Sequence, residues 1–104
     1  MTPDFTFEVA PAADLLSLMA NEKRLQILGL ILEREWDVSS LATEVGLSQS
    51  ALSQHLKKLR DGKLVKIRRE AQTLHYSSTS PSVMAILGTL QKIFYGSADL
   101  AHAA

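Results

Sequence analysis

One stretch, LSQSALSQHL at residues 47–56, predicts the fold of this chain. Ser48 is a good N-cap, and the helix that it opens is expected to span residues 49–61. A shorter helix is expected over residues 40–45, and Gly46 follows it in the place of a C-terminal cap. A short helix, a glycine-containing turn and a longer helix together form the signature of a helix-turn-helix.

The longer helix is expected to have two chemically different faces. At about 100° per residue, Leu52, Leu56 and Leu59 fall on one side and serine, glutamine and basic side chains on the other. Any surface helix is amphipathic, but this one also has no acidic residue between Glu44 and Asp61. Serine and glutamine can bond base edges or phosphates, so we expect this face to read DNA. The candidate reading residues are Ser48, Gln49, Ser50, Ser53, Gln54 and Lys57.

Three further side chains of this helix are expected to have other surroundings. Arg60, like Lys57, can meet a phosphate. His55 falls at the edge of the leucine face and is expected to pack against the domain rather than bind a metal. Lys58 falls on the flank, where it can meet solvent alone.

Charge is distributed unevenly along a chain whose formal net charge is zero. Residues 1–45 hold eight acidic and three basic residues, a net charge of −5. Residues 46–76 hold seven basic and two acidic residues, a net charge of +5. A basic segment inside a neutral chain is a local footprint of the kind that attracts phosphate.

After Gly62 the sequence changes to a strand pattern. Residues 64–69 and 73–77 read as two strands that residues 70–72 join into a hairpin. The connection has no Asn-Gly or Asp-Gly pair, so the position of its tip stays open. Beside a reading helix such a hairpin forms a wing that contacts phosphates or the minor groove, although edge strands also carry charge to discourage pairing. The candidate wing contacts are Arg68, Arg69, Gln72 and Thr73.

Two further helices are expected at the ends of the domain. The first opens at Pro11, and the last starts at Ser80–Pro81 and runs to Tyr95, before Gly96. Their apolar stripes are wider than packing on one neighbour needs, so we expect a homodimer, with core packing as the alternative. The candidate interface residues are Leu15, Leu18, Met19, Val83, Leu87, Leu90 and Phe94.

The remaining segments complete the predicted organisation. Residues 1–10 are expected to form a flexible arm, residues 11–96 the winged helix-turn-helix domain, and residues 97–104 a frayed tail. Residues 36–38 are expected to be a linker. Gly29 lies inside a predicted helix, where it costs about 1 kcal/mol relative to alanine, so we expect it to mark a close helix contact.

Composition excludes several classes of function. The chain has 104 residues, 46% hydrophobic and 21% charged, which is ordinary for one globular domain. It has no cysteine, which excludes disulfides, thiolate metal sites and thiol switches. No signal peptide is recognisable and the apolar stretches are too short to span a bilayer, so we expect a cytoplasmic protein. With no nucleophile–base pair and three scattered histidines, we expect no catalytic residue, no metal site and no cofactor.

Three segments carry a resemblance to a known family: ANEKRLQIL at residues 20–28, LSQSALSQHL at 47–56 and RREAQTLHYS at 68–77. They resemble the ArsR/SmtB family of winged-helix repressors, and within it the subgroup of NolR and HlyU, over about residues 15–95. The resemblance implies a mainly α-helical fold with a small β-hairpin between the fourth and fifth helices. It also implies a homodimer that joins through its terminal helices and binds a pseudo-palindromic operator. The DNA contacts that it implies are Ser48, Gln49, Ser50, Ser53, Gln54, Arg68, Arg69 and Gln72.

The sensing sites of this family are where the chain departs from it. Metal-sensing members often carry CVCDL before the reading helix, where residues 37–41 here read DVSSL. Redox-sensing relatives have two cysteines, and the comparable positions here are Gly29 and Tyr95. Other members bind metal on the last helix, where the comparable residues here are Ser80, Ser82, Ile93 and Gly96. The resemblance therefore implies DNA binding that neither metal nor thiol chemistry switches.

The sequence thus predicts a sequence-specific, DNA-binding transcriptional repressor. One alternative is a repressor that an unknown small-molecule inducer, bound between the terminal helices, releases from DNA. Another is a winged-helix module that binds proteins and never touches DNA, but it would require an acidic or apolar outer face over residues 49–60.

Overall fold

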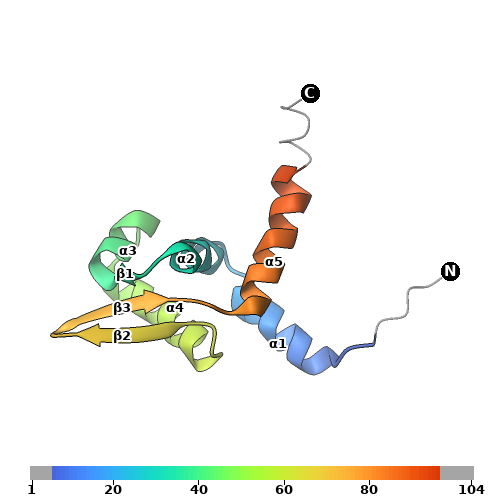
Figure 1. Cartoon of the computed structure of the whole chain (residues 1–104), viewed down its shortest axis with the longest axis horizontal. Helices are drawn as coiled ribbons and strands as arrows, with labels where there is room; N and C mark the ends of the chain where they lie inside the picture. The colour runs from blue at the N-terminus through green and yellow to red at the C-terminus, as the bar shows by residue number, and fades with distance from the viewer. Residues whose placement is uncertain (1–5, 97–104) are drawn as a thin grey trace.

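The computed structural model describes residues 6–96, which form five α-helices and a three-stranded antiparallel sheet (Figure 1). The strands lie in the order β1-β3-β2. This arrangement confirms the predicted class, a mainly α-helical winged helix-turn-helix. In chain order the elements are α1 (Val9–Met19), α2 (Glu22–Glu33), β1 (Trp36–Asp37), α3 (Val38–Val45), α4 (Gln49–Asp61), β2 (Lys66–Glu70), β3 (Thr73–Ser77), α5 (Pro81–Gln91) and a π-helical turn, Lys92–Gly96.

Side-chain caps fix where four of the helices begin. The capping oxygens belong to Asn21, Asp37, Ser48 and Ser80, and each accepts a hydrogen bond from the backbone N–H three residues later, at 3.0–3.2 Å. The bonds satisfy donors that the first turn of a helix otherwise leaves free. The predicted caps at Ser48 and Ser80 are therefore confirmed.

Two helices begin earlier than the sequence pattern predicts. Asp37 caps α3, so that helix begins at Val38 rather than Ser40. Helix α1 begins at Val9, two residues before Pro11. Proline is tolerated throughout a first helical turn, where its missing N–H has no partner to lose, so Pro11 does not mark the start.

The ends of α3 and α4 use different residues in the left-handed region. Gly46 has φ +71° and ends α3 as predicted. At the end of α4, Gly62 has φ −81° and it is Lys63 that takes φ +64°. Gly62 meets a different demand, because a Cβ at this position would lie 2.2 Å from Cδ1 of Leu18 on α1.

The core lies between α2, α3, α4 and the sheet. The leucine face of α4 points into it, with Leu52, Leu56 and Leu59 all at most 2% exposed. Removing one such side chain typically costs 2–5 kcal/mol, so the core fixes which face of α4 meets solvent. The other buried hydrophobic residues are Met19, Ile27, Leu28, Ile31, Leu41, Ala42, Val45, Leu64, Val65, Tyr76 and Val83.

A third strand replaces the predicted linker. Trp36 and Asp37 form β1 and pair with Tyr76 and His75 of β3. The indole N–H of Trp36 donates to the carbonyl of Leu30 at 3.0 Å. The linker prediction was wrong because a two-residue strand is too short to show alternation.

The hairpin has a two-residue turn. Strand β2 pairs with β3 from Lys66 opposite Ser77 to Glu70 opposite Thr73, so residues 71–72 form the tip. The first strand was expected over residues 64–69, but Leu64 and Val65 are core residues that precede it.

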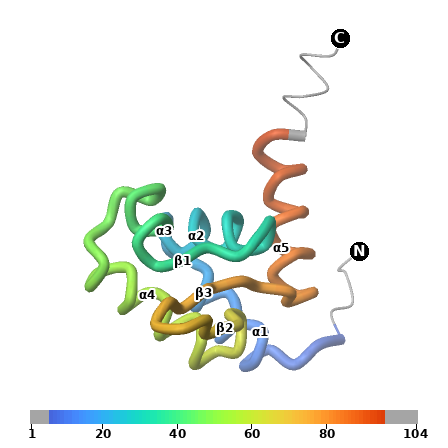
Figure 2. Tube along the Cα trace, turned by 60° about the vertical axis from the view of Figure 1, so that its left-hand side comes forward, coloured from blue at the N-terminus to red at the C-terminus, as the bar shows by residue number. Residues whose placement is uncertain are grey.

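The terminal helices project from this body. Helix α5 rises away from it, and α1 lies beside the base of α5 with its N-terminal end directed outward (Figures 1 and 2). Gly29, predicted to mark a close helix contact, has open space where a Cβ would lie, with no described atom within 4 Å. The prediction for Gly29 was therefore wrong within this chain.

Two of the predicted interface residues belong to the core instead. Met19 is 2% exposed and Val83 is fully buried, so neither is available to a partner. Leu15, Leu18 and Leu87 are partly buried against the same core. An apolar stripe in the sequence does not reveal how much of it the protomer itself covers, which is why these predictions failed for Met19 and Val83.

Candidate nucleic-acid interface

The polar face of α4 is exposed along its whole length. All six predicted reading residues, Ser48, Gln49, Ser50, Ser53, Gln54 and Lys57, are exposed. They project opposite the buried leucines, so the structure presents them together on one surface. An exposed helix of this kind has the dimensions that the major groove of B-DNA admits.

Local bonds distinguish the members of this face. The Ser48 hydroxyl accepts the capping bond from the N–H of Ala51 at 3.1 Å and lies 3.3 Å from the Ser50 hydroxyl. Lys57 forms an ion pair with Asp61 at 3.2 Å, with both side chains largely exposed. An exposed pair of this type is weak, so the Lys57 ammonium can exchange its carboxylate partner for a phosphate.

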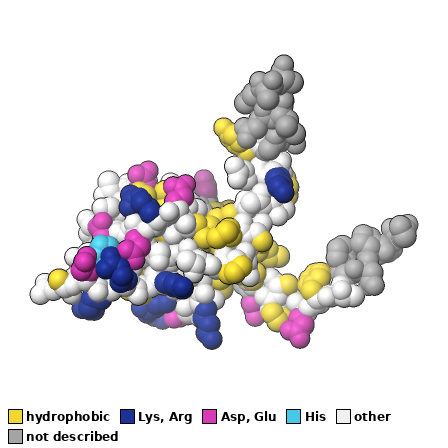
Figure 3. Space-filling view, in the orientation of Figure 1, with side chains coloured by type: hydrophobic (Ala, Val, Ile, Leu, Met, Phe, Trp, Pro, Cys, Tyr) yellow, Lys and Arg dark blue, Asp and Glu magenta, His cyan; other side chains and the backbone are white. Residues whose placement is uncertain are grey.

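A hollow of about 230 Å³ separates α4 from the wing. Ser53, Lys57 and Arg60 line it from α4, and its apolar floor is made by Leu56, Ile67 and Tyr76. Two cations and a hydroxyl beside a small cavity suit a phosphate oxygen. Figure 3 shows Lys and Arg side chains gathered along the edge formed by β2 and α4.

The two neighbouring arginines of the wing point to opposite faces of β2. Side chains alternate along a strand, so Arg69 shares a face with Ile67, which lines the hollow beside α4. Arg68 lies on the other face. Arg69 is exposed and has no ion-pair partner among the described residues.

Arg68 is held by Glu35, a residue between α2 and β1 that sequence reasoning missed. Its Nε lies 3.1 and 2.9 Å from the two Glu35 oxygens, and its Nη2 lies 2.9 Å from Oε1. These hydrogen bonds lower the pKa of Glu35 and raise that of Arg68. A second carboxylate, Glu70, lies 3.8 Å from Nη1. No local signal could have paired Glu35 with Arg68, because 33 residues separate them.

The tip of the wing is exposed. Gln72 and Thr73 are exposed beside it, as a contact with DNA requires. The turn residue Ala71 has φ +55°, a conformation that favours glycine. His75 lies behind the tip, with its Nε2 3.7 Å from Oε1 of Glu70.

Two other kinds of site were sought in the described residues. Within residues 6–96, no group of three His, Cys, Asp or Glu side chains lies close enough to hold a metal ion. No helix in that part of the chain is long and apolar enough to cross a membrane.

An exposed polar helix in a helix-turn-helix, flanked by a basic hairpin, defines the winged-helix class of DNA-binding proteins. Residues 21–66 match the family model described as "Bacterial regulatory protein, arsR family". The chain belongs to this family, and it is a DNA-binding transcriptional regulator, not an enzyme.

Individual relatives agree with this assignment. The chain is 56% identical to nodulation protein NolR of Rhizobium meliloti over 88 residues, which cover 85% of this chain and 72% of NolR. It is 48% identical to transcriptional activator HlyU of Vibrio cholerae over 85 residues, which cover 82% and 79% of the two chains. The crystal structure of NolR from Sinorhizobium fredii superposes with a TM-score of 0.82 at 55% identity, covering 90% of this chain and 97% of that one. The predicted resemblance is confirmed.

Proposed function

We propose that this protein is a repressor that binds a pseudo-palindromic operator as a homodimer. The observation that carries the proposal is the exposed face of α4, where serine and glutamine side chains stand beside the cationic hollow at Lys57 and Arg60. The first group has the donors and acceptors that read base edges, and the second has the charge that holds backbone phosphates. Repression needs nothing beyond occupancy of the operator.

The wing adds a phosphate contact through Arg69. Its side chain is exposed, lies on the same face of β2 as the hollow, and has no competing carboxylate among the described residues. Gln72 and Thr73 at the tip are placed to meet the DNA beside it. Arg68 contributes differently, because its guanidinium is engaged by Glu35 and it braces the wing against the domain.

The dimer uses apolar surface that the protomer leaves uncovered. On α1 this surface is Val9 and Leu16, which are 71% and 55% exposed. On α5 it is Leu90 and Phe94, where the helix has left the body, with Phe94 77% exposed. Apolar patches of this kind mark an interface when they occur together, and a two-fold dimer covers both helices at once.

A two-fold dimer presents two α4 helices to the DNA. Their separation is expected to match one turn of B-DNA, about 34 Å, so the operator is expected to have two inverted half-sites. Because its target is chromosomal DNA, the protein is expected to act in the cytoplasm.

Selection of bound sequences from a random DNA pool, followed by titration of the selected duplex, tests this function. We expect an inverted repeat that binds at least about 10³-fold more tightly than random DNA. Equal affinity for the selected and random duplexes would contradict a sequence-specific regulator. A reporter that rises, rather than falls, when the protein occupies its operator would favour activation, the role that the name of HlyU gives for that relative.

Operator binding is also proposed to be independent of metal and thiol chemistry. The chain has no cysteine, and the positions that bind metal on the last helix in the family hold residues such as Ser82 and Ile93. Titration of the operator should give the same affinity with a chelator, with added Zn²⁺ and with a reductant. A Zn²⁺-dependent release at stoichiometric metal would contradict this part of the proposal.

A further inference from the structure

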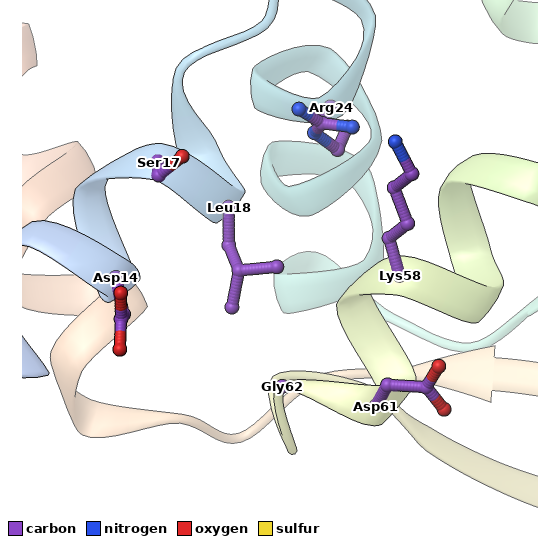
Figure 4. A pocket seen from close by; sticks show the side chains of 7 residues that line it. All are labelled: Asp14, Ser17, Leu18, Arg24, Lys58, Asp61 and Gly62. Carbon is purple, nitrogen blue, oxygen red and sulfur yellow. The ribbon is translucent and has the colours of Figure 1, made fainter.

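A second and larger hollow lies away from the reading face, where α1, α2 and the C-terminal end of α4 meet (Figure 4). Its volume is about 540 Å³, within the range of about 300–1,000 Å³ that small-molecule sites occupy. We call it the α1–α2–α4 groove. It is lined by Asp14, Ser17, Leu18, Arg24, Lys58, Asp61 and Gly62.

One side of the groove is cationic. Arg24 from α2 and Lys58 from α4 lie next to each other in Figure 4. Nε of Arg24 is buried and has no hydrogen-bond partner among the described residues. Neither side chain forms an ion pair within residues 6–96. A buried donor left without an acceptor is costly, so this side of the groove is suited to a carboxylate or a phosphate.

The neighbouring His55 reports the same positive potential. Its pKa is lowered first by burial and then by the charges of Arg24 and Lys58. The two cations are therefore close enough to act on a common point between α2 and α4.

The opposite side of the groove is anionic. Asp14 projects from α1 across the groove from Arg24, and Ser17 lies on the same helix (Figure 4). Asp14 forms no ion pair with another described residue, whereas Asp61 is already paired with Lys57. A simple anion would meet repulsion from Asp14, but a ligand that carries both charges would satisfy Arg24, Lys58 and Asp14 together.

We propose that the α1–α2–α4 groove binds a free amino acid. Its carboxylate lies between Arg24 and Lys58, its ammonium meets Asp14, and its side chain packs on Leu18. The separation of opposite charges across one open groove with an apolar floor is the chemistry that recognises such a zwitterion.

The groove stays open in the proposed dimer. At about 100° per residue, Asp14 and Leu18 lie roughly 140–180° around α1 from Val9, which is on the exposed apolar face. Lys58 likewise lies about 100° around α4 from Lys57. A ligand in the groove therefore competes with neither the partner subunit nor the DNA.

The groove also connects the dimer to the reading helix. Leu18 of α1 approaches Gly62 so closely that no Cβ fits between them, and both residues line the groove. A ligand that bridges α1 and α4 changes operator affinity if it prefers one arrangement of the two helices. This second effect rests on the proposed function, whereas amino-acid binding itself does not.

Calorimetric titration of the full chain with each standard amino acid separately tests the binding. We expect at least one to bind saturably, and Arg24→Gln and Asp14→Asn each to weaken it at least tenfold, because each removes one charged partner. Arg69→Gln, on the wing, serves as the control and should bind as the unaltered chain does. Circular dichroism must show that every variant is folded.

Two results would overturn the proposal. The first is that no amino acid binds, or that the bound one binds equally well to both variants. The second is that inorganic phosphate, or the same ligand without its amino group, binds as tightly as the amino acid. Selective operator binding by a chain that takes no amino acid would sink the groove proposal and leave the DNA-binding function intact.

Discussion

At the scale of single residues, Arg68 and Arg69 show that adjacent identical side chains can have different roles. Arg68 donates to both oxygens of Glu35 and therefore gives up most of its capacity for phosphate. Arg69 points to the other face of β2, has no such partner among residues 6–96 and remains fully available. The sequence shows only two consecutive arginines, so the difference comes from strand alternation and from one distant carboxylate.

Arg69→Gln is expected to weaken operator binding and to lower the salt dependence by about one unit of slope, the value for one lost phosphate contact. Arg68→Gln should leave the slope nearly unchanged, because Glu35 already neutralises that guanidinium. Glu35→Gln should raise the slope by freeing Arg68. Fluorescence anisotropy at several salt concentrations measures all three, and equal losses from the two arginine variants would contradict the assignment.

Ala71 is held at φ +55° in the wing turn, which costs a non-glycine residue about 1–2 kcal/mol. Ala71→Gly should therefore raise the free energy of unfolding by about 0.5–1 kcal/mol. Ala85→Gly, at an exposed position inside α5, should lower it by a similar amount. Urea denaturation measures both variants, and a loss of stability from Ala71→Gly would show that the turn is not strained.

At the scale of elements, α4 is fixed by three features that act together. The Ser48 cap sets where it begins, Leu52, Leu56 and Leu59 dock it on the core, and the close approach of Leu18 to Gly62 sets where it ends. His55 belongs to this docked side, half-buried against α2. Helix α4 therefore meets DNA as a rigid element rather than one that must fold on binding.

The burial of His55 beside Arg24 and Lys58 gives α4 a dependence on pH. The lowered pKa means that the unfolded chain takes up a proton below about pH 6.5, the ordinary histidine value, before the folded chain does. The free energy of unfolding should therefore fall as the pH drops from about 7.5 to about 5, and the contribution should be fully present above 6.5. His55→Gln should have a shallower slope over this range in urea denaturation, and identical slopes would be inconsistent with a lowered pKa.

At the scale of the whole molecule, the described chain is a compact reading head with two helices that extend beyond it (Figure 2). Helix α5 starts inside the core at Val83 and ends with Phe94 77% exposed. Hydrophobic side chains also gather where α5 leaves the body (Figure 3). A surface of this kind is expected to be covered by a second copy of the chain, which makes dimerisation a condition for operator binding.

Phe94→Glu would place a charge in the proposed interface while disturbing little of the protomer, since the side chain is exposed. We expect sedimentation velocity at micromolar concentration to show monomers and the operator affinity to fall at least tenfold, because the second half-site contact is lost. Gln91→Glu, on an exposed polar position of the same helix, is the control and should remain dimeric. A dimer that survives Phe94→Glu would exclude this face.

The sequence by itself determined the reading helix, its cap, its two faces, the hairpin beside it and the family. These features depend on capping chemistry and on a 3.6-residue period, which neighbours in the sequence express directly. Only the tertiary structure decided that residues 36–37 form a strand, that Glu35 holds Arg68, and that Met19 and Val83 are core while Leu16 and Phe94 are free. Each of these depends on a contact between residues far apart in the chain, which no local pattern encodes.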